Sequence, residues 1–308
     1  MNNVISTRVS VFRNIKDYKF ENKLTPEQKQ EIVNIIDKVV RGTMSLMNIN
    51  SMDEKVAKSL KENALILGNT QNVFVDKKDN IVINMFNGEH LTIVSADVGF
   101  NIKTIEKALN LVQTLANKIN FSFNDEYGYL MSDIAKIGAG IRLESNIMLS
   151  AIKSINKIEQ VKQNVSKLGY SLKETKFPGI YTLSTLCNLG IGEKQICSDF
   201  ENTLLKLQEL ELESIKMLDM SKHDDIVDKT QRSLAILNSA HMLNYEELYN
   251  MTSNLRIGLN LGLIDVGIEK LNEIHKLLIN KTNDYVSPEE MKNLAGTVKQ
   301  ILKGDKDV

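Results

Sequence analysis

Hydrophobic residues are spaced differently on the two sides of Gly192. Before it, short runs in which apolar and polar residues alternate predict strands, and apolar residues that recur every three or four positions predict helices. We expect strands within residues 4–20, 72–75, 81–86 and 91–94, helices at 26–41, 52–67 and 102–118, and then strands and a helix up to residue 186.

After Gly192 the spacing is almost entirely helical. The expected helices cover residues 193–220, 224–243, 245–255, 266–278 and 288–302. The pattern therefore predicts an α+β domain over residues 1–222, followed by a helical domain over residues 223–308. Within these helices we expect His223, His241 and His275 on the surface, Met217 and Met220 in the core, and residues 209–213 on a solvated helix edge.

Composition excludes several classes of function. The chain has 308 residues, of which 42% are hydrophobic and 25% charged, as in ordinary globular proteins. A net charge of −1 gives no basic field, so we expect no nucleic-acid binding. Neither an apolar run of about 18 residues nor a charged-then-apolar leader is visible, so we expect no membrane contact and a cytoplasmic location. The two cysteines, Cys187 and Cys197, have no metal-ligand spacing with the four histidines, and we expect no metal site.

The segment 121–142 carries the most specific pattern. Two pairs of aromatic residues flank a tight turn at residues 124–126, and two glycines, Gly138 and Gly140, lead to Arg142. Glycines let a backbone approach a ligand closely, and an arginine beside them can grip a phosphate. Such a glycine loop is common, however, and by itself is most often only a turn.

Two further segments, read together with this pattern, make it more specific. The N-terminal region contains Ser6-Thr7-Arg8 and Arg13-Asn14, and the helical region contains Arg232-Ser233-Leu234 and the run 255–262. Together with Phe123-Asn124, Gly128-Tyr129-Leu130 and Arg142, these residues resemble, in order and spacing, the ATP:guanido phosphotransferases, the family of the phosphagen kinases. The likeness is closest to the bacterial protein-arginine kinases. It implies an α+β fold in which an antiparallel sheet is flanked by helices and followed by a helical C-terminal domain.

The resemblance also implies which residues should form the active site. The family clamps the phosphates of ATP-Mg²⁺ with five arginines, of which Arg8 and Arg142 match. A second N-terminal arginine falls on Ser10. An acidic motif aligns with residues 86–92, where the catalytic glutamate falls on Gly88 and an arginine falls on Thr92, so that only Glu89 and His90 remain.

Three other parts of the family site have changed. The reactive cysteine falls on Asp133. The mobile loop that supplies a second carboxylate is shortened, because residues 170–177 run almost directly into residues 178–181. An arginine of the phosphoarginine-binding motif falls on Glu290, whose carboxylate would repel a phosphate. We therefore expect no catalytic residue and a weak residual nucleotide-phosphate site at Arg8, His90 and Arg142, which could hold ATP or ADP with Mg²⁺.

Three functions fit these residues. The first is an inactive pseudokinase that acts as a scaffold or regulator in the stress-response and Clp protease system. The second is an active protein-arginine kinase that recruits Glu89, Asp133 or Glu174, and the third is a weak nucleotide sensor. The resemblance implies protein partners: a zinc-finger activator, a heat-shock repressor and the Clp ATPase. A homodimer is expected through the helical domain, where the series Leu255, Ile257, Leu259, Leu261 and Leu263 either packs inside or faces a partner.

Overall fold

The computed structural model describes residues 2–68, 70–76, 80–186, 189–279 and 287–304. Cys187 and most of the turn expected at residues 77–80 lie outside the described residues. Within them, no helix combines the length and the apolar character that a bilayer span requires.

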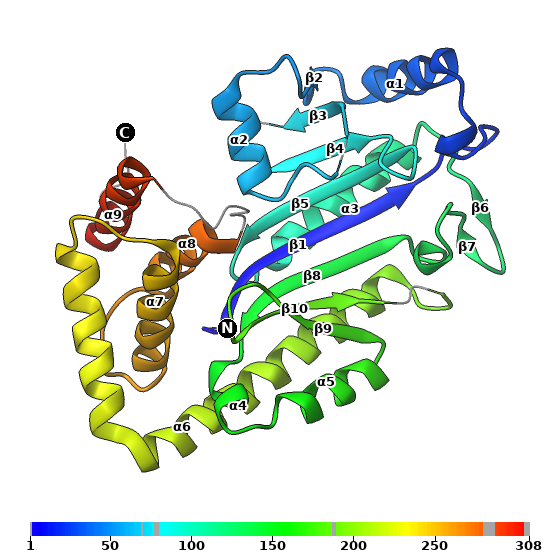
Figure 1. Cartoon of the computed structure of the whole chain (residues 1–308). Helices are drawn as coiled ribbons and strands as arrows, with labels where there is room; N and C mark the ends of the chain where they lie inside the picture. Colours follow the sequence, from blue (N-terminus) through cyan, green and yellow to red (C-terminus); the bar gives the residue numbers. More distant parts are fainter. Residues whose placement is uncertain (1, 69, 77–79, 187–188, 280–286, 305–308) are drawn as a thin grey trace.

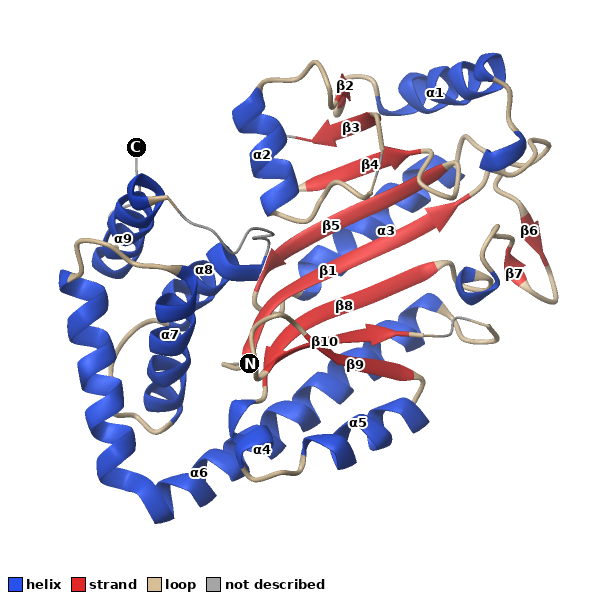
Figure 2. Ribbon diagram, in the orientation of Figure 1, coloured by secondary structure: helices blue, strands red, loops and turns tan. Residues whose placement is uncertain are grey.

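An eight-stranded sheet forms the centre of the protein, and every neighbouring pair of strands in it is antiparallel (Figures 1 and 2). Its order is β2 (Ser45–Asn48), β3 (Asn72–Asp76), β4 (Ile81–Met85), β5 (Leu91–Val98), β1 (Val4–Arg13), β8 (Ile141–Met148), β10 (Ile180–Thr185) and β9 (Tyr170–Glu174). A separate small hairpin consists of β6 (Phe123–Asn124) and β7 (Gly128–Tyr129).

Helices cover the two faces of the sheet unequally. One face packs against α1 (Pro26–Val40), α3 (Ile102–Ala116), α5 (Ile158–Lys167) and the first half of α6 (Glu193–Ser239), and it contains the main core. The other face carries a smaller cluster beside α2 (Glu54–Glu62), which includes Leu60, Val82 and Val94, while Met148 and Ile180 at one end of that face belong to a separate cluster. Alternation along the strands produces this division, because Ile83 and Ile93 belong to the main core while their neighbours Val82 and Val94 point the opposite way. Much of the second face is therefore left open.

The helical part consists of the second half of α6 with α7 (Tyr245–Asn260), α8 (Ile268–Ile279) and α9 (Pro288–Lys303). Its core includes Leu237, Leu255 and Leu271, and it also takes in Ile5 and Met148 from the end of the sheet. The expected fold class, an α+β domain with an antiparallel sheet followed by helices, is confirmed.

Two of the expected helix boundaries are wrong. The break expected between residues 220 and 224 is present as a kink at Lys222 (φ −144°, ψ 30°), where two helices join within α6, but the second of them ends at Ser239 and not at residue 243. The kink lies at the expected end of the first domain, and the division of the chain at residue 222 stays a prediction. The helix expected at 52–67 ends at Glu62, since the chain turns at Ala64 with a φ of 53°.

Arg256 ties the helical part to the start of β1. It is fully buried and donates to the carbonyl oxygen of Asn2 and, at 2.7 Å, to Oδ1 of Asn272. Asn260, one turn further along α7, donates to Oδ1 of Asn3 at 2.8 Å. Burial lowers the pKa of Arg256 to about 9. The family-like run 255–262 therefore serves to dock α7 against the N-terminus.

Three expectations about single side chains in the helices are wrong, each because tertiary packing overrides the local pattern. His275 is fully buried 3.3 Å from Arg256, and burial, reinforced by that positive charge, holds its pKa well below the ordinary value. Glu211 is buried and accepts the backbone N–H groups of residues 151 and 152, and desolvation raises its pKa to about 7 despite those bonds. Met217 and Met220 are exposed, since α6 has left the sheet there.

Candidate functional site

The open face of the sheet brings Arg8 and Arg142 together. In the register of β1 and β8, Arg8 lies opposite Glu144 and Ser10 lies opposite Arg142. Side chains at every second position of a strand share a face, so both arginines and Glu144 project from the same side of the sheet. Two of the three residues expected at the nucleotide site are therefore neighbours.

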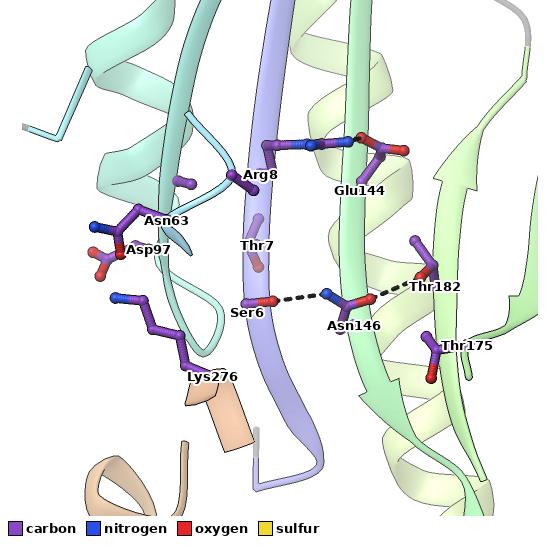
Figure 3. Close-up of a pocket in the computed structure, with 12 residues that line it drawn as sticks. Ser6, Thr7, Arg8, Asn63, Asp97, Glu144, Asn146, Thr175, Thr182 and Lys276 are labelled. Atoms are coloured by element: carbon purple, nitrogen blue, oxygen red, sulfur yellow. Dashed lines mark hydrogen bonds and ion pairs between the residues drawn. The ribbon is translucent and has the colours of Figure 1, made fainter. Parts of the chain in front are cut away.

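Glu144 accepts from Arg8 and forms an ion pair with Arg142. Nε of Arg8 donates to Oε2 of Glu144 at 2.9 Å, and Nη2 of Arg8 contacts the same oxygen (Figure 3). Nε of Arg142 lies 3.4 Å from Oε1 of Glu144, and the Ser184 hydroxyl donates to that oxygen at 3.3 Å. The Arg8–Glu144–Arg142 cluster thus carries two positive charges and one negative charge.

Sequence reasoning missed Glu144, although a signal was present. Glu144 follows Arg142 by two positions on a strand and must share its face. Its contact with Arg8, however, depends on the pairing of two strands whose facing residues are 136 positions apart. Periodicity along one segment does not contain that register.

A polar cavity of about 250 Å³ adjoins this cluster. Asn146 spans its floor, donating to the Ser6 hydroxyl at 3.0 Å and accepting from the Thr182 hydroxyl at 2.7 Å (Figure 3). Lys276 enters the cavity from α8, on the side where Asp97 lies (Figure 3). The lining contains two cationic and two anionic side chains, Arg8 and Lys276 with Asp97 and Glu144, so the cavity has no strong charge of either sign.

His90 lies apart from this cluster. It precedes Leu91, which pairs with Arg13, five residues along β1 from Arg8, or roughly 17 Å at the rise of an extended strand. Its Nδ1 accepts the N–H of Ile15 at 2.9 Å, and Nε2 donates to the carbonyl of Lys19 at 2.7 Å. Burial lowers the pKa of His90, although the bond to the Lys19 carbonyl and the nearby Glu89 and Glu21 partly oppose the shift. Both ring nitrogens therefore already have backbone partners.

Glu89 belongs to the same buried network. Its Oε2 accepts from Nδ2 of Asn14 at 2.6 Å, and its carboxylate also accepts from the backbone N–H and hydroxyl of Ser132. Asn14 in turn accepts the N–H of His90 at 2.9 Å. We call this the Asn14–Glu89–His90 network. It joins β1 to the loop after β4 and to the loop after β7.

Gly88 and Asp133, which the sequence resemblance aligns with a catalytic glutamate and cysteine, both shape loops. Gly88 has a φ of 86°, and its N–H donates to Glu21 at 2.6 Å. Asp133 accepts the N–H of Ala135 at 3.0 Å and so caps the short helix η2 (Ile134–Lys136). Thr92, at the position of a family arginine, is buried, and its hydroxyl makes no hydrogen bond with the residues that the structure describes.

Glu174 secures the shortened connection between β9 and β10. Its carboxylate accepts from Nζ of Lys153 at 2.6 Å and from the N–H of Gly179 at 2.7 Å. Desolvation raises the pKa of Glu174, but these bonds outweigh it and leave the pKa below its ordinary value. Each carboxylate considered as a recruited catalytic base, at Glu89, Asp133 or Glu174, thus already has hydrogen-bond donors.

Arg13 holds the glycine loop in place. The guanidinium is fully buried, lies 3.5 Å from the centroid of the Tyr129 ring, donates to the carbonyl of Ala139 at 3.1 Å and pairs with Glu193 at 2.6 Å. Gly140 has a φ of 59°, and a Cβ there would approach Nη1 of Arg13 to 2.8 Å. Only glycine fits at this position without displacing the arginine.

The arrangement does not fit a nucleotide triphosphate with Mg²⁺. The Glu144 carboxylate already pairs with both Arg8 and Arg142, and its negative charge would repel a phosphate brought to them. Among the described residues, no group of three or more His, Cys, Asp and Glu side chains is placed to hold a metal ion. We therefore derive no reaction step through this cofactor.

Comparison with known proteins identifies the family. Residues 19–214 match the family described as ATP:guanido phosphotransferase, C-terminal catalytic domain. Residues 223–304 match the protein-arginine kinase McsB C-terminal domain. The chain therefore belongs to the ATP:guanido phosphotransferase family, as its sequence motifs predict.

Individual relatives agree with this assignment. The chain is 26% identical to a protein-arginine kinase of Clostridium novyi over 98% of its own length and 95% of the relative, and 26% identical to that of Clostridium tetani over 97% and 95%. Among solved structures it is similar to lombricine kinase (TM-score 0.61, 16% identity, 68% of this chain and 66% of that one). It is also similar to the duplicated taurocyamine kinase of Schistosoma mansoni (TM-score 0.60, 20% identity), covering 68% of this chain and 33% of that longer one. At these identities the structural likenesses support the fold alone.

Proposed function

We propose that this protein is a catalytically inactive homologue of the protein-arginine kinases that acts as a scaffold or regulator. The observation that carries the proposal is the position of Glu144 between Arg8 and Arg142. A carboxylate built into the sheet neutralises part of the positive charge that a phosphate would need.

The chemistry of phosphoryl transfer supports the same proposal. Catalysis of this reaction rests on positioning and on electrostatic stabilisation of the transferred group. Gly88 has no side chain that could orient a guanidinium, and Asp133 is engaged in capping a turn. Loss of one such group typically lowers the rate by about a hundredfold to a thousandfold. Their combined absence should leave no useful turnover.

The scaffold role, the partners and the cellular location follow from kinship alone. The curated relatives are protein-arginine kinases. By resemblance to that branch we propose a cytoplasmic role in the stress-response and Clp protease system. The expected partners are a zinc-finger activator, a heat-shock repressor and the Clp ATPase.

An acid-labile phosphoarginine assay tests the absence of activity. The purified full-length chain, incubated with ATP-Mg²⁺ and an arginine-rich protein substrate, should give no phosphoarginine above a reaction without enzyme. Turnover on the order of 1 per second, as in active kinases, would show that another group has replaced the missing carboxylate.

Association through the helical part is a second element of the proposal. Leu255 is buried in the helical core and Leu259 packs against it, whereas Ile257, Leu261 and Leu263 are partly exposed and do not belong to it. We expect the full chain to scatter light as a homodimer at tens of micromolar, and the variant Ile257→Asp to shift it towards monomer. A full-length chain that is monomeric at that concentration would remove the homodimer from the proposal.

A weak nucleotide sensor is the second candidate function. The side chains of Arg8 and Arg142 are 32% and 47% exposed, and the cluster keeps one net positive charge beside a cavity. Titration with ADP-Mg²⁺ separates the two functions, since a sensor requires binding at cellular nucleotide concentrations.

A further inference from the structure

A groove of about 610 Å³ lies on the face of the sheet opposite the Arg8–Glu144–Arg142 cluster. Its walls are α3 and the first turns of α6, which both cover this face (Figure 1). The groove is separate from the candidate nucleotide site, and any function of it is independent of whether that site binds or reacts.

The wall formed by α3 presents an apolar stripe. Ile105, Leu109, Val112 and Ala116 line the groove at spacings of four, three and four residues, which is one face of a helix. Ile105 and Val112 are buried in the main core, but Leu109 is only partly buried and Ala116 is exposed. The outer edge of the stripe thus faces the groove.

The wall formed by α6 presents small side chains to that stripe. Cys197 and Ser198 line the groove opposite α3. Helices that pack directly against each other lie about 8–10 Å apart, with larger side chains filling the space between them. Here Cys197 and Ser198 are too small to fill that space, although Glu193, Lys194 and Glu201 of α6 also line it, and the 15 residues of α3 span about 22 Å.

Charges on the two walls favour a cationic occupant. Glu106 on α3 and Glu201 on α6 both line the groove, and neither forms an ion pair with a residue that the structure describes. The charge of Glu193 is balanced by Arg13, and Lys194 adds one positive charge. A ligand with basic residues along both edges would meet a carboxylate on each wall.

We propose that this groove binds an amphipathic helix of a partner protein, about four turns long, with an apolar stripe between rows of lysine or arginine. The partner helix would place its apolar residues on the stripe of α3, as amphipathic helices do in other hydrophobic grooves. Its basic residues would pair with Glu106 and Glu201 on the rims. A shallow groove open along one side suits a helix better than a compact small molecule.

Two labelled peptides of 15 residues test the proposal by fluorescence anisotropy with the full-length chain. Both carry the same leucine stripe, and the remaining positions are lysine in one and glutamate in the other. The lysine peptide should bind at least tenfold more tightly than the glutamate peptide, and its affinity should fall as salt is raised. Failure of the lysine peptide to bind, or equal binding of both peptides, would overturn the proposal.

Matched variants assign any binding to the groove. Ser198→Trp fills it and should weaken the lysine peptide at least tenfold, whereas Thr114→Trp, at an exposed position of α3 outside the lining, should not. Glu106→Lys with Glu201→Lys should also weaken it, in contrast to Glu209→Lys with Glu213→Lys, which change the same charge at exposed positions of α6. Binding that survives both groove variants would contradict the proposal. If light scattering shows a dimer that only Ser198→Trp dissociates, the occupant is a second copy of this chain and the partner helix is wrong.

Discussion

The Asn14–Glu89–His90 network and the Arg8–Glu144–Arg142 cluster both contain family-like residues, but the two regions differ in how deeply those residues are buried. In the network every side chain is buried and bonded to the backbone or to another member. In the cluster the arginines are partly exposed and share a carboxylate. Arg13 and Arg256 are family-like residues that are likewise buried and hold the fold together, whereas Gly88 and Asp133, which the sequence resemblance aligns with catalytic groups, shape loops.

Physical chemistry explains why the two regions differ. Removing one partner from a buried hydrogen-bonded pair leaves the other unsatisfied, at a cost of about 1–3 kcal/mol and more if the group is charged. Ion pairs that face solvent contribute only about 0–1 kcal/mol. Substitutions on the open face therefore alter function with little effect on folding, while those in the network threaten the fold.

The largest expected effect comes from Arg13→Met. This variant removes a buried guanidinium with its bonds to Glu193 and to the glycine loop, and loss of a hydrogen bond to a charged group costs about 1.5–3 kcal/mol. Arg142→Met, the matched change on the open face, should cost less than about 1 kcal/mol. Urea denaturation gives both free energies of unfolding. Equal losses of unfolding free energy in the two variants would contradict the distinction between the buried and the open regions.

Protonation of His90 is expected to have a smaller effect on the free energy of unfolding. Its folded-state pKa is lowered by burial, so above its unfolded pKa of about 6.5 both states are neutral and the network is intact. As the pH falls below about 6.5, the unfolded state takes up a proton that the folded state does not, and stability declines by up to about 1.4 kcal/mol per pH unit until the folded pKa is reached.

The variant His90→Gln isolates this contribution. Its free energy of unfolding should change less between pH 7.5 and pH 5.5 than that of the unmodified chain. The lowered pKa of His275 also reduces the free energy of unfolding as the pH falls, in the unmodified chain and in the variant alike. Glu211, with its raised pKa of about 7, acts in the opposite direction, because its folded form binds a proton between about pH 4.5 and 7. Both contributions cancel in the comparison, and identical slopes for the two proteins would contradict the assignment to His90.

Local signals predicted much of the fold. The helix expected from residue 26 begins at Pro26, after Thr25 in a capping box, because such starts depend on residues within one turn. The strands at β3, β4 and β5 follow from alternation. The break at Lys222 also follows from the local pattern, whereas the exposure of Met220 could not be predicted, since it depends on where α6 leaves the sheet.

The candidate site was less predictable than the fold. The structure brings Arg8 and Arg142 together, whereas His90, which motif spacing assigned to the same site, lies apart from them; whether Arg8 and Arg142 bind a nucleotide stays a prediction. A motif gives the order of residues along the chain, whereas the direction of each side chain depends on strand pairing and on the backbone groups nearby. The pairing of Glu144 with both arginines is visible only in three dimensions.

Calorimetric titration with ADP-Mg²⁺ of the unmodified chain and of Glu144→Gln tests most directly whether Glu144 occupies the nucleotide arginines. Glutamine keeps the size of the side chain but removes the charge, and Glu126→Gln, at an exposed turn, is the matched control. The unmodified chain and the control should bind no more tightly than about 1 mM, equivalent to about −4 kcal/mol. Glu144→Gln should bind at least tenfold more tightly, a gain that Arg8→Ala removes in the double variant. Micromolar binding by the unmodified chain that Arg142→Ala abolishes would contradict the account and identify a nucleotide sensor.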